Sequence, residues 1–500
     1  MELGPVEILT AVGIAILVLH YYLTKNFDFW RRKNVVGPKP LPFFGNFKDN
    51  LFGKVHIALL FEKFCRQFKD AGLIGLFGLN GKPSLIVRDP DLLKDVLIKD
   101  FHVFQDRGLY VDAKVDPLNQ NLLNLEHERW RPLRNKLSPV FTSGKLKEMF
   151  YLIVDCARHF EDYVNTLVDR DEAVEFRELT AKFTTQTIGV CAFGLDTKAI
   201  HDEDSDFRKF GKAIFSTSLL SICKRLLQDS FPKIYALFGV FGYSKANRFF
   251  IRTIKETVEY RKKNNVRRND FVDLLMDMQG QPEKMNTIDF TDMFLTGQAL
   301  VFFAAGFETS STTMSNALYE LALHPEFQDK VRKEIRGQIE KNEGQLTYDC
   351  IKQMKYLDQV VKETLRKYPP GSILRRKSSE EYTFNGTDVT IPKGTSIFIP
   401  VWAIHRDPQI YEDPDTFDPE RFSEENVKDR HPMNYLPFGD GPHNCIGLRF
   451  ANYQTKVGII TVINKFKVNT CRETIQTYRV EPRPIIPTPE GGIRLKLSKC

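Results

Sequence analysis

The sequence contains eight cysteines but no Cys-x-x-Cys pair, and it has no Gly-rich dinucleotide-binding fingerprint. Widely separated cysteines argue against a zinc module or a disulfide framework and indicate a reducing compartment. Without the fingerprint, electrons for any redox reaction would have to come from outside the chain. The excess of positive charge is small, +7, and is spread along the chain, so nucleic-acid binding is not expected. A basic patch for an acidic protein or for anionic lipid fits this charge equally well.

The composition is that of a folded protein. Apolar residues make up 42% of the chain and 40 residues are phenylalanine, which argues against disorder. A chain of 500 residues could form one large domain or two or three smaller ones.

An apolar run occupies residues 8–23, where only Thr10 and His20 are clearly polar. It is slightly shorter than the about 20 residues that span a bilayer, but apolar residues before it extend it and aromatic residues after it supply interfacial anchors. Glu2 and Glu7 precede the run, whereas a signal peptide starts with basic residues.

The charges after the run set the expected orientation. The first basic residue, Lys25, follows the run, which favours a cytoplasmic position for the rest of the chain. We therefore expect residues 1–24 to form one N-terminal membrane anchor, with a cleaved signal peptide as the alternative. The proline-rich stretch Gly37–Pro42 is extended and semi-rigid, because proline fixes φ and restricts the residue before it. Residues 25–46 are expected to be a basic and proline-rich linker, or an ordinary loop, ahead of a main domain over residues 47–500.

One cysteine, Cys445, lies in a glycine-rich turn just before a predicted helix. Glycines let a loop turn tightly against something flat and bulky, here between Phe438 and Gly447. The positive end of the helix dipole and the backbone N–H groups favour a thiolate. A rigid thiolate shielded by Phe438 suits a metal ligand, and the alternative is a buried, inert cysteine.

A long helix is predicted over residues 289–321. Ala305, Glu308 and Thr309 fall on one face at i, i+3 and i+4. A hydroxyl beside a carboxylate can relay protons, and Gly306 would let a flat cofactor or small ligand approach. The alternative is a buried helix with Glu308 turned to solvent.

Two shorter helices carry further candidate residues. Trp130 and Arg134, spaced i, i+4, could hold a pair of carboxylates, although this signal is weak alone. Glu363 and Arg366 are separated by three positions, which is a usual spacing for a surface ion pair on a helix.

Other stretches give a coarser outline. Residues 150–193 read as successive amphipathic helices, and Val389–Ile399 as a β-hairpin. Residues 101–125 read as a long loop, and Glu490–Leu497 as a last strand. Phe231–Gly242 is apolar throughout, with buried core as its default interpretation.

These motifs, taken in order, resemble the cytochrome P450 family. The run from Phe438 to Gly447 resembles its haem-binding loop, except that the family usually has Arg where His443 stands. Ala305–Ser310 resembles its oxygen-activation motif, Trp130–Arg134 its propionate-binding helix, and Glu363–Arg366 with Phe417–Phe422 its buried Glu/Arg network.

The resemblance implies a mainly α-helical cytochrome P450 fold with small β-sheets, preceded by one transmembrane helix. It also implies haem b with the Cys445 thiolate as axial ligand and metal-binding residue. The remaining implied roles cover the haem, the protons, the substrate pocket and the supporting network. The haem would be held by Trp130, Arg134, Arg376, His443, Phe438, Gly447 and Ala305; protons would be delivered by Thr309 and Glu308; the substrate would contact Val301, Ala305, Ser372 and Ile373; and the network would join Glu363, Arg366 and Arg421.

Short stretches such as Ser138–Gly144 and Ala403–Pro408 narrow the resemblance to the insect microsomal cytochromes P450 of family six. That group is associated with oxidation of plant compounds and insecticides. The implied function is insertion of one oxygen atom of O2 into lipophilic substrates, either such xenobiotics or endogenous lipids or hormones. In this group Phe231–Gly242 corresponds to a connection that touches the membrane.

The resemblance also implies partners and a location. Electrons would come from NADPH through NADPH-cytochrome P450 reductase, with cytochrome b5 as an optional further partner. Arg129, Arg131, Lys136 and Arg449 are candidates for a basic face toward the reductase. The location would be the endoplasmic reticulum membrane, with the catalytic domain on the cytoplasmic side. The alternatives are a haem-thiolate enzyme that rearranges peroxides and a non-catalytic carrier of haem or apolar ligands.

Overall fold

The computed structural model describes residues 4–109, 112, 115–170, 172–215, 228, 235, 244–268, 270–280 and 288–500. The segment Phe231–Gly242 therefore lies outside the described residues, apart from Tyr235.

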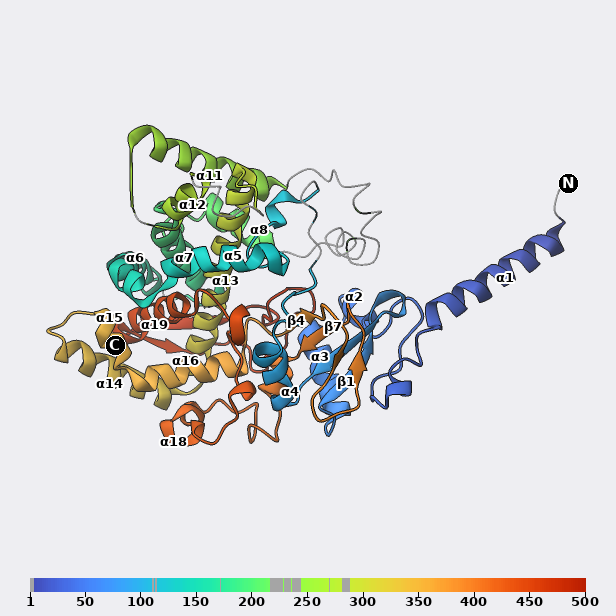
Figure 1. Ribbon diagram of the computed structural model, residues 1–500. Helices are drawn as coiled ribbons and strands as arrows, with labels where there is room; N and C mark the ends of the chain where they lie inside the picture. Colours follow the sequence, from blue (N-terminus) through green and yellow to red (C-terminus); the bar gives the residue numbers. More distant parts are fainter. Residues whose placement is uncertain are drawn as a thin grey trace.

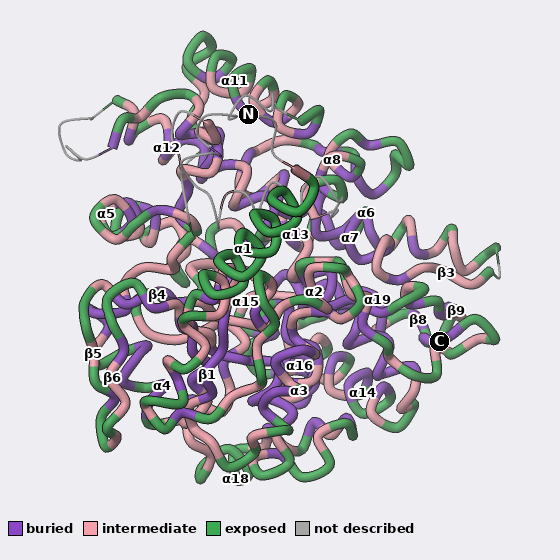
Figure 2. The backbone as a smooth tube through the Cα atoms, turned by 90° about the vertical axis from the view of Figure 1, so that its right-hand side faces the viewer, coloured by how far each residue is buried: buried purple, intermediate pink, exposed green. Residues whose placement is uncertain are grey.

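Helix α1 (Pro5–Thr24) projects from one side of the body (Figure 1), and none of its residues is buried. Figure 2 shows that most of its length is exposed. Proline at the first position and a hydrogen bond from the Gly4 N–H to Glu7 Oε2 (2.9 Å) begin the helix. It is long and apolar enough to cross a membrane, a property that signal sequences near an N-terminus share.

The chain that follows α1 packs against the body of the protein. Trp30 is 3% exposed and donates its indole N–H to the Leu76 carbonyl at 2.8 Å. Gly37 lies so close to Gly75 that a side chain there would overlap the Gly75 carbonyl oxygen. The proline-rich segment is therefore held along strand β1 (Leu73–Phe77).

The body is mainly helical, as expected. Its other described α-helices are α2 (Lys48–Leu51), α3 (Ile57–Gln67), α4 (Pro90–Lys94), α5 (His127–Leu137), α6 (Ser143–Val168), α7 (Phe176–Ile188), α8 (Asp206–Phe215), α11 (Lys245–Asn264), α12 (Phe271–Gln279), α13 (Asp292–Leu323), α14 (Pro325–Lys341), α15 (Tyr348–Lys352), α16 (Lys355–Lys367), α17 (Val401–Ile404), α18 (Glu424–Val427) and α19 (Leu448–Lys465).

Three small sheets accompany the helices. The other described strands are β2 (Pro83–Val87), β3 (Val174–Glu175), β4 (Leu374–Lys377), β5 (Tyr382–Thr383), β6 (Thr390–Ile391), β7 (Ser396–Ile399), β8 (Phe466–Asn469) and β9 (Arg494–Lys499). They form sheets ordered β1-β2-β7-β4, β3-β9-β8 and β5-β6. In the first sheet β2 and β7 run parallel, whereas β4 is antiparallel to β7.

The hairpin expected over Val389–Ile399 is wrong. Its first run, β6, pairs with β5, and its second run, β7, pairs with β2 and β4. The reason is that the connecting turn bonds to a third segment: the Gly394 N–H donates to the Ser378 carbonyl, and the Ser378 N–H to the Thr395 carbonyl. The two runs are therefore directed into different sheets.

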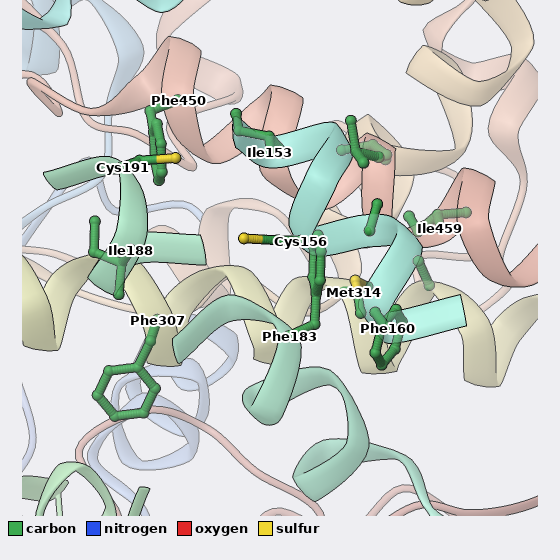
Figure 3. Close-up of a cluster of buried hydrophobic side chains, with 14 of the residues drawn as sticks. Ile153, Cys156, Phe160, Phe183, Ile188, Cys191, Phe307, Met314, Phe450 and Ile459 are labelled. Carbon is green, nitrogen blue, oxygen red and sulfur yellow. The ribbon is translucent and has the colours of Figure 1, made fainter. Parts of the chain in front are cut away.

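The core is built around the central helix α13, which packs against α7 and α19. Figure 3 shows side chains of this core, including Phe183, Met314 and Ile459. The Met314 side chain of α13 packs directly on the backbone of α19, because a side chain at Gly458 would overlap the Met314 sulfur. The hydroxyl of Thr184 on α7 donates to the Phe307 carbonyl of α13 at 3.0 Å. Hydrogen bonds between helices thus add to burial in fixing α13.

Glu363 and Arg366 lie inside the body instead of on its surface, and both side chains are 0% exposed. The guanidinium donates to the carboxylate through Nε (2.7 Å) and Nη2 (2.8 Å) and to the His405 carbonyl through Nη1 (2.8 Å). Arg421 Nε lies 3.6 Å from Glu363 Oε1, a looser contact. Burial raises the pKa of Glu363, while Arg366 acts in the opposite direction.

We expect Glu363→Gln to lower the free energy of unfolding by about 3–5 kcal/mol, because Arg366 would keep a buried charge without its counter-ion. Thermal unfolding followed by circular dichroism measures this. Glu425→Gln, on the exposed surface of α18, is the control and should have almost no effect. Equal unfolding midpoints for both variants would contradict this account of the pair.

Candidate functional site

The loop that carries Cys445 is closed by its own backbone. The Cys445 N–H donates to the Phe438 carbonyl at 2.9 Å. Gly441 has φ +69° and lies so close to the Leu97 carbonyl that any side chain would overlap it. Glycine is therefore required there both for its conformation and for the close approach. Gly447, by contrast, has no atom within 4 Å of where a Cβ would point.

The Cys445 side chain has exposed surface, yet burial raises the pKa of its thiol. The two observations agree if the sulfur faces a void inside the molecule instead of the outer surface. A hydrogen bond from Gly447 and the charge of Arg134 lower the pKa, which is the direction expected from the helix that follows. Without a cation at the sulfur, the effect of burial on the thiol pKa is larger than the combined effect of the hydrogen bond and of Arg134.

Helix α13 exposes Ala305 in the middle of a mostly buried stretch. The Thr309 hydroxyl donates to the Ala305 carbonyl at 2.7 Å, so the two residues share a face as predicted. We expected Gly306 to open space for a ligand, but it does not, because a Cβ there would lie 2.7 Å from Ile188 Cδ1 on α7. Its absent side chain serves the packing of α13 against α7.

Glu308 does not point freely to solvent. Its Oε1 lies 3.1 Å from Nη2 of Arg177, at the start of α7. Among the described residues, the hydrogen bonds of the Thr309 and Glu308 side chains do not join them to each other. The predicted relay pair is thus adjacent in sequence, and its carboxylate is held by a cation.

Three arginines, one buried and two partly buried, gather beside the Cys445 loop without a balancing carboxylate among the described residues. Arg376 is 3% exposed, and burial lowers its pKa to about 10. Burial and the charges of Arg376 and Arg134 lower the pKa of Arg107 to about 9. No described carboxylate lies within salt-bridge distance of these three arginines. Buried charges normally have partners, so this cluster fits an anionic group.

Unsatisfied donors surround the same place. Arg376 Nε and Trp130 Nε1 are buried and have no hydrogen-bond partner. Arg134 Nη2 donates to the Asn444 side chain at 2.8 Å, next to Cys445. Sequence reasoning missed Arg107, because it lies in an aperiodic loop where no motif marks it. Together these donors fit an acid group bound close to the Cys445 sulfur.

His443 has a different environment from the other candidates for anion binding. Its Nε2 donates to the Gln105 carbonyl at 2.6 Å, and its ring lies 3.9 Å from the Trp130 ring, centroid to centroid. Burial and the nearby arginines lower its pKa to about 2, so the ring is neutral. Nδ1 can then only accept a hydrogen bond. The side chain is placed to fix Trp130 and residue 105 rather than to donate to an anion.

The expected substrate residues are only partly brought together. Val301 is half-buried on α13 one turn from Ala305. Ser372 is buried, and its carbonyl accepts the Trp402 N–H at 3.0 Å. Ile373 packs with the cluster around α3.

Three of the four residues expected on a basic face, Arg131, Lys136 and Arg449, are exposed. The fourth, Arg129, is paired with the Glu126 carboxylate and donates to Gln120.

We expect His443→Ala to lower the free energy of unfolding by about 2 kcal/mol, since it removes a buried hydrogen bond and an aromatic contact. Amide hydrogen exchange in residues 101–107 should rise, because this segment loses its bond to the Cys445 loop. His102→Ala, at an exposed position in the same segment, is the matched control. Unchanged exchange in both variants would contradict the assigned role.

Comparisons with known proteins identify the family of the chain. The family model described as "Cytochrome P450" matches residues 35–497. The probable cytochrome P450 6a14 of Drosophila melanogaster is 39% identical, over 98% of each chain. Cytochrome P450 6B1 of Papilio polyxenes is 36% identical, over 98% of this chain and 99% of its own. Cytochrome P450 6A1 of Musca domestica is 38% identical, over 98% and 97%. The chain therefore belongs to the cytochrome P450 family and is an oxidoreductase of the monooxygenase type, with homologues in insect family six.

Proposed function

We propose that this chain is a membrane-bound monooxygenase that holds haem b through the Cys445 thiolate. The observation that carries the proposal is the set of arginines without a carboxylate partner and of unsatisfied donors next to Cys445, whose thiol pKa is raised by burial. Haem matches both features, because its iron takes a thiolate ligand and its two propionates are anionic. When bound, haem supplies the chemistry that activates O2 and inserts one oxygen atom into the substrate.

The surrounding residues would hold and orient this group. Trp130 Nε1, Arg134 and Arg376 would donate to the propionates, and Arg107 would add a cation where the loop has His443. His443 would act indirectly by fixing Trp130. Phe438, Gly447 and Ala305 would leave room for the ring on the two sides of the site, because Gly447 has open space and Ala305 is exposed.

Proton delivery would depend on α13. The Thr309 hydroxyl can turn from the Ala305 carbonyl toward the void and donate there. Glu308 would pass protons inward only after its carboxylate leaves Arg177, so the ion pair would act as a gate.

The substrates would be lipophilic molecules, either xenobiotics such as plant compounds and insecticides or endogenous lipids and hormones. Val301, Ala305, Ser372 and Ile373 would contact them. Electrons would come from NADPH through NADPH-cytochrome P450 reductase, with cytochrome b5 as an optional further partner. The exposed cations Arg131, Lys136 and Arg449 suit an acidic docking surface.

The proposed location is the endoplasmic reticulum membrane. Residues 1–24 would be the anchor and residues 25–46 the linker, with residues 47–500 as the catalytic domain in the cytoplasm. The exposed apolar helix α1 and the basic residues after it support this arrangement.

The first test is the carbon monoxide difference spectrum of the dithionite-reduced protein in native membranes. We expect a strongly red-shifted Soret band, and we expect Cys445→Ala to abolish it. Cys471→Ala, which changes a partly buried cysteine just after β8, should keep the band. A band at shorter wavelength in the unaltered protein would argue against thiolate ligation, and no haem signal in folded protein would overturn the proposal.

A second test uses two neighbouring arginines on β4 whose side chains point to opposite faces of the strand. We expect Arg376→Gln to lower haem affinity at least tenfold, because it removes a charged donor from the propionates. Arg375→Gln should retain haem. Transfer of haem to apomyoglobin measures the affinity without any turnover, and equal transfer rates for both variants would contradict the assignment.

A further inference from the structure

A row of polar residues runs along the second half of helix α13. Its members stand four positions apart: Glu308, Thr312, Asn316 and Glu320. Residues at this spacing share one side of a helix, with successive Cβ atoms about 5–6 Å apart. Thr312 is 2% exposed, and Asn316 and Glu320 are 0% exposed. Met314 lies on the other side of the helix, in the apolar core (Figure 3), so these four residues form a polar row inside the protein.

Most side chains of the polar row have atoms without a hydrogen-bond partner among the described residues. These atoms are the Thr312 hydroxyl, both amide atoms of Asn316 and Oε2 of Glu320, and all of them are buried. Thr312 differs in this from the other threonines of α13, whose hydroxyls each donate to the carbonyl four residues earlier. Buried polar atoms are normally paired with protein atoms or with ordered water.

Tyr478 faces the middle of the polar row from outside α13. Its hydroxyl is buried, and the Asn316 amide lies beside it without a hydrogen bond of good geometry. Burial raises the pKa of this phenol, whereas Arg177 and Asn316 lower it, so both lie near its oxygen. Arg177 is the residue that holds the Glu308 carboxylate. Tyr478 therefore connects the middle of the polar row with its Glu308 end.

The other end of the polar row approaches the surface. Glu320 Oε1 accepts a hydrogen bond from the Tyr368 hydroxyl, and the Tyr368 ring lies 4.5 Å from the Tyr478 ring, centroid to centroid. Glu320 Oε2 lies 3.6 Å from Nε2 of His324, whose side chain is 34% exposed. A series of polar groups thus extends from the partly exposed His324 to Glu308.

The groups along the polar row fit water better than an ion. The Glu308 carboxylate already has Arg177 at 3.1 Å. The Glu320 carboxylate has Lys367 at 2.8 Å. The remaining atoms include donors, Arg177 Nε and Asn316 Nδ2, and acceptors, Asn316 Oδ1 and Glu320 Oε2. A metal ion or an anion would satisfy only one of these sets, whereas water both donates and accepts.

We propose that the polar row holds a continuous chain of internal water molecules (the water chain) that carries protons from the surface at His324 to Glu308. This inference rests on the proposed function, because it concerns the protons that Glu308 delivers. Insertion of one oxygen atom of O2 into a C–H bond consumes two electrons and two protons and releases one water. The reductase supplies the electrons, and the water chain supplies the protons. Thr312, Asn316 and Tyr478 are positioning residues that hold the water.

The first test asks whether the Thr312 hydroxyl has a partner. Thr312→Val removes the hydroxyl at nearly constant volume, and circular dichroism follows thermal unfolding of the haem-loaded, full-length protein in detergent. We expect the unfolding midpoint to fall by about 1–2 °C, because a hydrogen bond to water is lost. Thr296→Val, whose hydroxyl is bonded to the Asp292 carbonyl at 2.8 Å, is the matched control and should behave alike. An unchanged or higher midpoint in Thr312→Val alone would overturn the proposal, since removal of an unpaired buried hydroxyl does not destabilise.

The second test asks whether protons pass along the polar row. Oxygen uptake driven by NADPH is measured in nanodiscs with the reductase, in H2O and in D2O, after subtraction of uptake by the reductase alone. Asn316→Leu fills the row with an apolar side chain of similar volume, so we expect the ratio of the rates in H2O and D2O to rise about twofold or more. Asn316→Ser leaves room for a further water and should keep the ratio of the unaltered protein.

The order of the two Asn316 variants separates proton transfer from packing. Serine leaves the larger cavity, so a role in packing alone predicts more damage from Asn316→Ser than from Asn316→Leu. Equal isotope ratios in the two variants, or a higher ratio in Asn316→Ser, would overturn the proposal.

The carbon monoxide difference spectrum of the same samples separates this proposal from the proposed function. A red-shifted band in Asn316→Leu together with the higher isotope ratio supports the water chain. The same band with an unchanged isotope ratio overturns the water chain and leaves the proposed function standing. Loss of the band in the unaltered protein overturns the proposed function, and with it the delivery of protons to Glu308.

Discussion

The site around Cys445 depends on one constraint: it holds positive charge inside the protein without a counter-ion from the protein. Arg376 comes from a sheet, Arg134 from helix α5 and Arg107 from a loop, and the fold brings them to one place beside Cys445. Such a cluster is costly in an empty protein, since like charges repel and burial removes their water. The cluster becomes favourable when a bound group supplies negative charge. Binding of that group therefore raises the free energy of unfolding.

The packing around α13 lets this charge cluster coexist with a firm core. The helix is packed closely against α7 and α19, where side chains fill the space beside glycines: Ile188 beside Gly306 and Met314 beside Gly458. Ala305, next to Gly306 in the chain, is exposed on another side of the helix. A helix that is rigid on one side can border a void on the other without collapsing into it, because the surrounding side chains have no freedom to repack.

Sequence reasoning was most successful where a signal is local and periodic. The apolar run of α1, the helix spacing of α13 and the helix with Trp130 and Arg134 are each contained in one stretch, and the family was identified from such stretches. Contacts between distant segments were beyond it. The hydrogen bond of His443 to Gln105 joins residues 338 positions apart. The hairpin predicted at Val389–Ile399 does not form because its turn bonds to Ser378. Arg107 belongs to no recognisable motif. These depend on the tertiary fold, which overrides local pattern.

The segment after α1 is attached to β1, so α1 has a mechanical connection to the protein interior. Trp30 donates to the Leu76 carbonyl and Gly37 lies against Gly75, so the chain after α1 is attached to the first strand of the four-stranded sheet. The last strand of that sheet is β4. If α1 is the membrane anchor, as proposed, a sideways pull or tilt of α1 would therefore be transmitted to the sheet that holds Arg376.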